Sequence, residues 1–210
     1  MHTRAIHNKK LGKLVTVRPL ANGDTRTVTA LFDRLSDASR ASRFHAAKPR
    51  LTDREAAILA EVGPNSHVLV AHVGTDPLPA GLARLARDRS DPGTAEIAFE
   101  VADCYQRAGI GSLLVDMLLA DARAAGIRRV DALVAISNRP ALDLLHRILD
   151  RATLRFEDGV TCISATLERN SKRTSGSPAR DRRSLRTAKF SGRGWDRTSD
   201  PSRVKRVLSR

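Results

Sequence analysis

Three apolar segments separated by short turns constrain this chain most. The segments span residues 67–73, 80–86 and 95–101, and the turns between them are rich in glycine, proline and aspartate. Strands joined by such short turns pair with their neighbours in sequence, so the pattern predicts an antiparallel meander. A series of parallel strands would instead need a longer crossover between each pair.

Helices and further strands are predicted on both sides of the meander. Apolar residues at helical spacing predict helical regions over these ranges: 25–36, 39–62 with an interruption at Pro49, 109–125 and 138–149. Further strands are expected at 14–20, 130–136, 153–157 and 160–167. The predicted fold class is α/β (α+β), with a mixed, mostly antiparallel sheet of about six to seven strands and flanking helices.

Composition divides the 210 residues into a globular part and a basic tail. Of the formal net charge of +14, residues 170–210 contribute +10, from 13 Lys/Arg and 3 Asp. We expect a disordered N-terminal extension over 1–13, one domain over 14–168, and a disordered basic tail over 169–210. Residues 194–203 resemble the translated edge of a transfer-RNA gene, so we interpret the tail as a read-through.

The same composition restricts location and partners. The polar N-terminus and the two cysteines, Cys104 and Cys162, favour a reducing cytoplasm without a disulfide framework. No segment approaches the roughly 20 apolar residues of a membrane span, so no membrane partner is expected. The tail offers only Phe190 and Trp195 for stacking on bases, so nucleic-acid binding would be nonspecific at most.

A glycine-containing loop, Gln106 to Ser112, lies between a predicted strand and the helix over 109–125. Its glycines allow a tight turn, and the free N–H groups at a helix start attract a pyrophosphate. A Walker loop is excluded because no Gly-Lys-Ser/Thr follows. A dinucleotide-binding fingerprint is disfavoured because Leu114 stands where its third glycine would be.

The loop pattern Gln/Arg-x-x-Gly-x-Gly/Ala, met by Gln106, Gly109 and Gly111, resembles that of the GCN5-related N-acetyltransferases. The resemblance covers residues 14–168 and the order of the predicted elements. It implies a sheet splayed between its fourth and fifth strands, here residues 95–101 and 130–136. It also implies transfer of an acetyl group from acetyl-CoA, as donor substrate, to an amine, without a metal.

This resemblance also implies the residues that bind the coenzyme. Val101 would pair with the pantetheine arm, and Asn138 would contact the coenzyme from the start of a helix. The pyrophosphate would be held by Gln106, Arg107, Ala108, Gly109, Ile110, Gly111 and Ser112. Two departures from the pattern weaken the expected phosphate affinity: Ala108 replaces a usual Gly, Arg or Lys, and Asp103 stands where proline is frequent.

Three further segments, residues 39–44, 49–52 and 95–101, resemble the acetyltransferase domain of bacterial protein lysine acetyltransferases. This resemblance implies Glu96 as the catalytic glutamate and a protein lysine as the acceptor. A small amine (an aminoglycoside, a polyamine or an amino acid) is the alternative acceptor. A third interpretation is a non-catalytic module that binds an acyl-CoA. The chain is expected to be a monomer or a homodimer.

A base is needed because a lysine, with a reference pKa of about 10.4, is almost wholly ammonium near neutral pH. A carboxylate can remove a proton from this ammonium, directly or through a water. Glu96 and Glu100 share one face of a regular strand and compete for this role, unless a bulge, common in the family, separates them. The Val101 backbone N–H is the expected donor to the developing oxyanion.

Other side chains have a functional and a structural interpretation. Tyr105, or alternatively His146, would be the general acid toward the leaving thiolate, although both positions also suit packing or exposure. Cys104 lacks a nearby histidine partner and is not expected to be a nucleophile. The remaining candidates are isolated histidines without a metal-ligating constellation: His45, His67 and His72.

Overall fold

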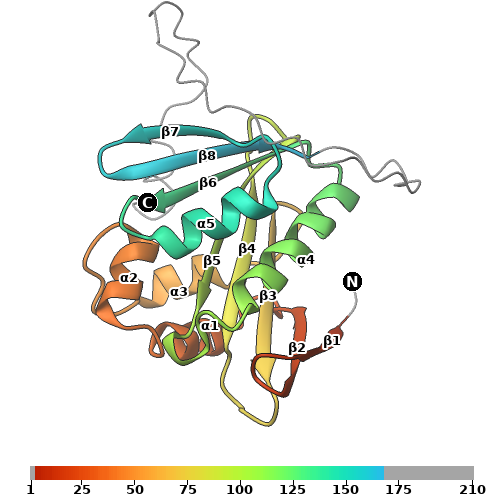
Figure 1. Ribbon diagram of the computed structural model, residues 1–210, viewed down its shortest axis with the longest axis vertical. Helices are drawn as coiled ribbons and strands as arrows, with labels where there is room; N and C mark the ends of the chain where they lie inside the picture. Colours follow the sequence, from red (N-terminus) through yellow and green to blue (C-terminus); the bar gives the residue numbers. More distant parts are fainter. Residues whose placement is uncertain (1–2, 168–210) are drawn as a thin grey trace, which may run out of the picture. The chain divides into compact units, whose positions relative to one another are not determined.

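The computed structural model describes residues 3–167, in which eight strands form one sheet (Figure 1). The strands are β1 (Arg4–Asn8), β2 (Lys13–Pro19), β3 (Ser66–Val73), β4 (Gly81–Arg87), β5 (Thr94–Val101), β6 (Arg129–Ala135), β7 (Thr153–Glu157) and β8 (Val160–Thr166). The helices are α1 (Thr25–Phe32), α2 (Asp37–Phe44), α3 (Asp53–Leu59), α4 (Ile110–Ala124) and α5 (Arg139–Ile148), with a 3₁₀ turn, η1 (Asp103–Tyr105). The predicted tail, 169–210, lies outside the described residues.

The strands are ordered β1-β2-β3-β4-β5-β6-β8-β7, and the β5–β6 pair is parallel whereas every other neighbouring pair is antiparallel. The predicted meander is confirmed as β3, β4 and β5. The predicted class, a mixed and mostly antiparallel sheet with flanking helices, is confirmed as well. The described sheet has one strand more than the upper predicted number, because β1 was not expected.

Strands β5 and β6 diverge after a short paired segment. They pair only at Thr94↔Arg129, Ala95↔Val130 and Glu96↔Asp131, although β5 continues to Val101. Figure 1 shows β6, β8 and β7 turning away from β3, β4 and β5. This divergence is the predicted splay, and it leaves one edge of the second half of β5 without a neighbouring strand.

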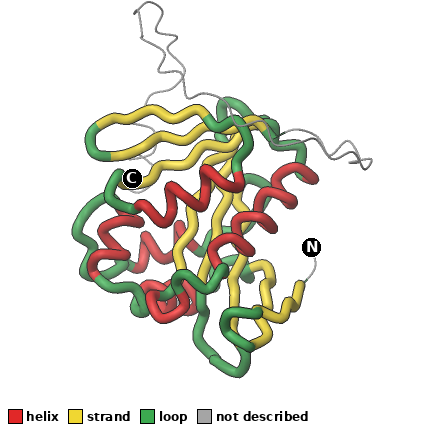
Figure 2. Tube along the Cα trace, viewed as in Figure 1, coloured by secondary structure: helices red, strands yellow, loops and turns green. Residues whose placement is uncertain are grey.

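Helices cover both faces of the sheet (Figure 2). On one face, α4 and α5 pack on a core that includes Leu114, Leu145 and Ile97, and on the other, α1 and α3 pack on Val70 and Leu82. Because side chains alternate along a strand, odd-numbered residues of β5 face α4 and even-numbered residues face the opposite side. The catalytic candidates on β5 therefore lie on the face away from α4.

Helix α2 differs from the other helices because every one of its residues is partly or fully exposed. It contacts both β5 and β6, so it lies beside the splay. Ser36 caps it through a hydrogen bond from the Ser39 N–H, and the partly buried Phe44 at its end packs edge-on against Phe32. A helix held in this way brings charged side chains to the opening between the strands.

The prediction that residues 1–13 are disordered is wrong for the described part of that segment. Residues 4–8 form β1, which pairs with β2 from Arg4↔Val17 to Asn8↔Lys13. The polar sequence concealed this strand because backbone hydrogen bonds, and not an apolar side-chain pattern, hold it at the edge of the sheet. In the connecting turn, Leu11 packs against the main core.

Local turn and cap motifs in the sequence agree with the structure. Thr52 and Glu55 form a capping box at the start of α3. Asp158 and Gly159 both have positive φ angles, as a two-residue hairpin turn between β7 and β8 requires. Such short motifs depend on neighbouring residues only, so the sequence is sufficient to identify them.

Candidate active site

A cleft of about 800 Å³ opens where β5 and β6 separate. Its wall is formed by β5 from Ile97 onward, by β6, by α2, by the glycine-containing loop and by α5. The predicted coenzyme-binding residues that line it are Val101, Gln106, Arg107, Gly109, Gly111, Ser112 and Asn138. The other two, Ala108 and Ile110, have buried side chains, so only their backbone groups are suited to contact a ligand.

The loop leads directly into α4. Gly109 is the N-cap of α4 with φ 88°, and among the described residues no side chain caps this helix start. A Cβ on Gly111 would come within 3.2 Å of Leu144 Cδ1, so glycine permits close packing between the two helices. The uncapped N–H groups and the positive end of the helix dipole fit a diphosphate, as expected for coenzyme A.

The backbone of Val101 is positioned at the open edge of β5. The neighbouring Ala102 N–H donates to Ala80 O at 2.9 Å, on the β4 side. Because successive N–H groups of a strand point to opposite edges, the Val101 N–H points toward the splay. This is the direction required of a donor to a pantetheine amide or a thioester carbonyl.

The two glutamates share a face of β5, and the bulge that is common in the family does not form between them. The register with β4 runs without interruption from Arg87↔Ala95 to Gly81↔Val101, which keeps the alternation regular. Glu100 lines the cleft and accepts a hydrogen bond from Arg43 Nε at 2.6 Å. Glu96 is the last β5 residue paired with β6 and lies just before Ile97, the first β5 residue of the cleft wall.

Charged neighbours from three other elements surround Glu96. Burial raises the pKa of Glu96, the guanidinium groups of Arg43 and Arg84 oppose that rise, and the carboxylate of Asp131 adds to it. The net result is that the pKa of Glu96 is raised. A carboxylate with a raised pKa is a stronger base than an ordinary glutamate, while the two cations favour its charged form.

No sequence pattern assigned a role to Arg43, Arg84 or Asp131. Arg43 stands in the segment that resembles protein lysine acetyltransferases, but the resemblance carried no function for it. Arg84 could have been noticed as a charged residue within the otherwise apolar segment 80–86, and its guanidinium donates to Ile58 O. Asp131 becomes a neighbour of Glu96 only through the parallel pairing of β5 with β6.

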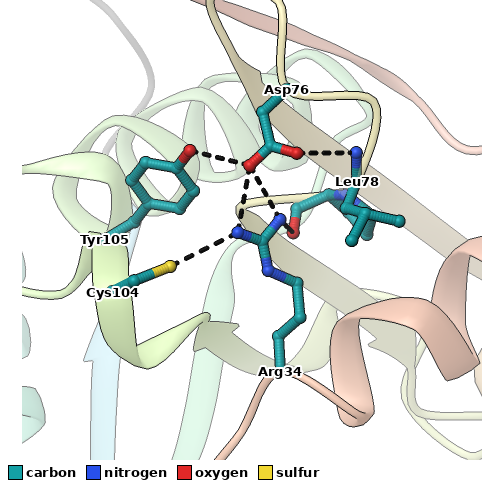
Figure 3. Close-up of polar contacts among 6 residues, drawn as sticks. Arg34, Asp76, Leu78, Cys104 and Tyr105 are labelled. Atoms are coloured by element: carbon teal, nitrogen blue, oxygen red, sulfur yellow. Dashed lines mark hydrogen bonds and ion pairs between the residues drawn. The ribbon is translucent and has the colours of Figure 1, made fainter.

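The hydroxyl of Tyr105, a predicted general acid, has a carboxylate partner. It donates to Asp76 Oδ2 at 2.7 Å, and Arg34 binds the same oxygen at 3.0 Å (Figure 3). The hydrogen bond from Tyr105, together with those from the Leu78 N–H and Arg34, lowers the pKa of Asp76 to about 2 despite burial. Tyr105 lines the cleft, but this bond favours a structural role for its hydroxyl.

Asp103, which departs from the family pattern, holds α2 beside the loop. Its carboxylate accepts hydrogen bonds from the Ser36 N–H at 2.6 Å and from the Gln106 side chain at 2.6 Å. Burial alone would raise the pKa of Asp103, but hydrogen bonds from Ser39 and Ser36 lower it. The negative charge is thus engaged by donors on α2 and on the loop, which limits its effect on a bound phosphate.

The remaining candidates lie apart from the cleft wall. His146 is exposed on α5, and Cys104 is an exposed thiol 3.3 Å from Arg34. His67 Nε2 lies 2.8 Å from Asp121 Oδ2.

Within residues 3–167 there is no group of three or more His, Cys, Asp or Glu suited to a metal ion. No helix in this range is long and apolar enough to cross a bilayer.

Comparisons with known proteins agree with this geometry. Residues 28–150 match the model of the acetyltransferase (GNAT) family. Acetyltransferase PA5475 of Pseudomonas aeruginosa is 30% identical over 137 residues, which cover 63% of this chain and 73% of that protein. Acetyltransferase Pat of Mycolicibacterium smegmatis is 38% identical over 69 residues, 33% of this chain but only 20% of that longer protein.

A solved structure shows the same fold. The GNAT domain of S. lividans PAT superposes with a TM-score of 0.70 and 26% sequence identity, covering 79% of this chain and 97% of that domain. Together with the match to Pat, this similarity confirms the resemblance to the acetyltransferase domain of protein acetyltransferases.

Proposed function

The chain belongs to the acetyltransferase (GNAT) family of acetyl-CoA-dependent N-acetyltransferases, and from this premise we propose that its acceptor is a protein lysine. The observation that carries the proposal is the placement of Glu96, a partly buried carboxylate with a raised pKa, at the point where β5 and β6 separate. A base at this position suits an acceptor that arrives as an ammonium ion. The similarity to Pat and to the S. lividans PAT domain supports a protein lysine as that acceptor.

Binding of the donor uses backbone groups at one end of the cleft. The N–H groups at the start of α4 and the loop around Gly109 would hold the diphosphate. Asn138, which caps α5 by accepting from the Ala141 N–H, lies on the same cleft and would contact the coenzyme. When bound, acetyl-CoA supplies an activated acetyl thioester. The Val101 N–H would donate to the thioester carbonyl oxygen as negative charge develops there.

Activation of the acceptor uses carboxylates at the other end. Glu100, on the cleft wall, would attract an incoming ammonium, and its carboxylate forms an ion pair with Arg43. Glu96 would then accept the proton through a water, because it lies just beyond the residues of the wall. The neutral amine attacks the acyl carbon, the carbon–sulfur bond breaks, and the proton that the nitrogen loses on becoming an amide is taken up by the thiolate as coenzyme A leaves.

The acceptor can be identified by mass spectrometry. The full chain is incubated with acetyl-CoA and a bacterial acyl-CoA synthetase, alongside Glu96→Gln and a reaction without enzyme. We expect acetyllysine on the synthetase with the wild type and at least about a hundredfold less with the variant. Release of free thiol with polyamines, aminoglycosides or amino acids, but not with the protein substrate, would contradict the proposed acceptor. Equal acetylation by both forms would exclude Glu96 as the base.

We also propose a cytoplasmic location. Neither Cys104 nor Cys162 forms a disulfide in the described residues, which supports a reducing compartment. Measuring the location of a tagged full-length protein by fractionation tests this, and recovery outside the cytoplasm would contradict it.

A further inference from the structure

The hairpin between β1 and β2 brings a cation to the phosphate end of the cleft. Lys10, at the tip of this hairpin, lines the cleft, and its Nζ donates to Arg107 O at 3.2 Å. Lys10 and Arg107 are 97 positions apart in the sequence, so only the fold brings them together. The expected disorder over 1–13 had excluded this segment from the site.

Asn8 connects the hairpin to the loop through hydrogen bonds. The Asn8 Oδ1 accepts hydrogen bonds from the N–H groups of Lys10 and Leu11, each at 3.0 Å, which closes the turn. Its Nδ2 donates to Ala108 O at 2.8 Å, directly beside the contact made by Lys10. One amide side chain therefore sets the conformation of the hairpin tip and its distance from the loop.

Two positively charged side chains, Lys10 and Arg107, line this end of the cleft. In the part of the chain that the structure describes, Lys10 and Arg107 form no ion pair with a carboxylate. An ammonium has three donors, and the contact with Arg107 O uses one of them. Two cations beside the uncapped start of α4 form a strong site for an anion.

We propose that Lys10 binds a phosphate group of coenzyme A and that Asn8 is the positioning residue that holds Lys10 at the loop. The inference rests on the proposed function only in that coenzyme A is the ligand, and it is independent of the acceptor. Coenzyme A carries two sources of the same chemistry, the diphosphate and the 3′-phosphate of its ribose. Binding of dephospho-coenzyme A, which lacks the 3′-phosphate, distinguishes them.

Isothermal titration calorimetry of the full chain with coenzyme A tests the proposal. Lys10→Met keeps the aliphatic stem and removes the charge, and we expect about three- to tenfold weaker binding at low salt. Lys9→Met is the matched control, because the exposed Lys9 precedes Lys10 and is not part of the cleft wall. The control should bind as the wild type does, and Lys10→Arg should retain most of the affinity.

The salt dependence of coenzyme A affinity and the affinity for dephospho-coenzyme A give two readouts that a purely structural effect would not change. Loss of one phosphate contact should reduce the slope of affinity against salt concentration for Lys10→Met but not for Lys9→Met. If the loss persists with dephospho-coenzyme A, Lys10 binds the diphosphate, and if the loss disappears, it binds the 3′-phosphate. In an Asn8→Ala background, Lys10→Met should cost less affinity than in the wild type.

The proposal is overturned if Lys10→Met, folded as judged by circular dichroism, binds coenzyme A as tightly as Lys9→Met does. It is also overturned if Lys10→Met and Lys10→Arg lose affinity equally, because the effect would then not depend on charge. A wild type that fails to bind coenzyme A at all would instead contradict the donor assignment on which the proposed function rests.

Discussion

The two ends of the cleft are built in different ways. The end proposed to bind the phosphates is made largely by a contiguous segment, Gln106 to Ser112, most of which lines the cleft and which leads into the uncapped start of α4. The glutamate end is assembled from separate elements: Glu96 on β5 is influenced by Arg43 on α2, Arg84 on β4 and Asp131 on β6. One end uses backbone geometry, and the other uses the electrostatics of side chains that are distant in sequence.

This difference predicts that one end of the cleft controls the affinity for coenzyme A and the other controls the rate constant of acetyl transfer. Substitutions in the loop should change the affinity for coenzyme A, because they alter a surface that the bound ligand contacts. Substitutions around Glu96 should change the rate constant of transfer, because they alter proton removal from the acceptor. Variants at the two ends therefore separate binding from catalysis.

The largest effect is expected for Glu96→Gln. Removal of the proposed base should lower kcat by about 100- to 1000-fold, while calorimetry should give an unchanged affinity for coenzyme A. Glu100→Gln is the matched control on the same strand face, and we expect it to raise KM for the acceptor with less than about a tenfold loss of kcat. A larger loss of kcat for Glu100→Gln than for Glu96→Gln would show that Glu100, and not Glu96, is the base.

The next effect is expected for Gly109→Ala. Gly109 has φ 88° and Gly126, which follows α4, has φ 79°, and a Cβ at either would meet no atom within 4 Å. Both alanine variants should therefore lose about 1 kcal/mol of stability through backbone strain alone. Only Gly109→Ala should also weaken coenzyme A binding, by about fivefold, since it displaces the loop. Equal affinities of the two variants would show that loop conformation does not control binding.

A smaller effect is expected for Arg43→Gln. The Arg43 guanidinium lowers the pKa of Glu96, so its removal lets that pKa rise further. Glu96 must be deprotonated to act, and activity increases as the pH rises through its pKa. The acidic limb of the pH–rate profile should therefore move to higher pH, with about two- to fivefold lower activity on that limb. A shift to lower pH, or an altered affinity for coenzyme A, would contradict this assignment.

The smallest effect on catalysis is expected for Tyr105→Phe. If its hydroxyl only supports Asp76, kcat should stay within about twofold of the wild type, whereas a general acid would cost more. The folded-state pKa of Asp76, about 2, lies below its ordinary value of 3.8, so its stabilisation is present above pH 3.8 and is lost as the pH falls toward 2. The variant should thus be less stable by about 1 kcal/mol at neutral pH, and thermal unfolding should show the difference vanishing near pH 2.

How much could be predicted from the sequence depends on the range of the interactions. The meander and the helix that follows the loop were predicted correctly, since each follows from neighbouring residues. Strand β1 was missed because its polar side chains give no apolar pattern. A bulge between Glu96 and Glu100, which the sequence left open, is absent because the register with β4 is regular from Ala95 to Val101.

The sequence by itself determined the local parts of this protein: the loop with its two glycines, the amphipathic helix behind it, and the resemblance to one enzyme family. Backbone conformation over a few residues depends on local sterics and on the spacing of apolar residues, and both can be read along the chain. Only the tertiary structure decided that Arg43, Arg84 and Asp131 influence Glu96, and that Lys10 reaches the loop. Charge interactions act through space, and the sheet order and the splay of β5 from β6 set the distances that matter.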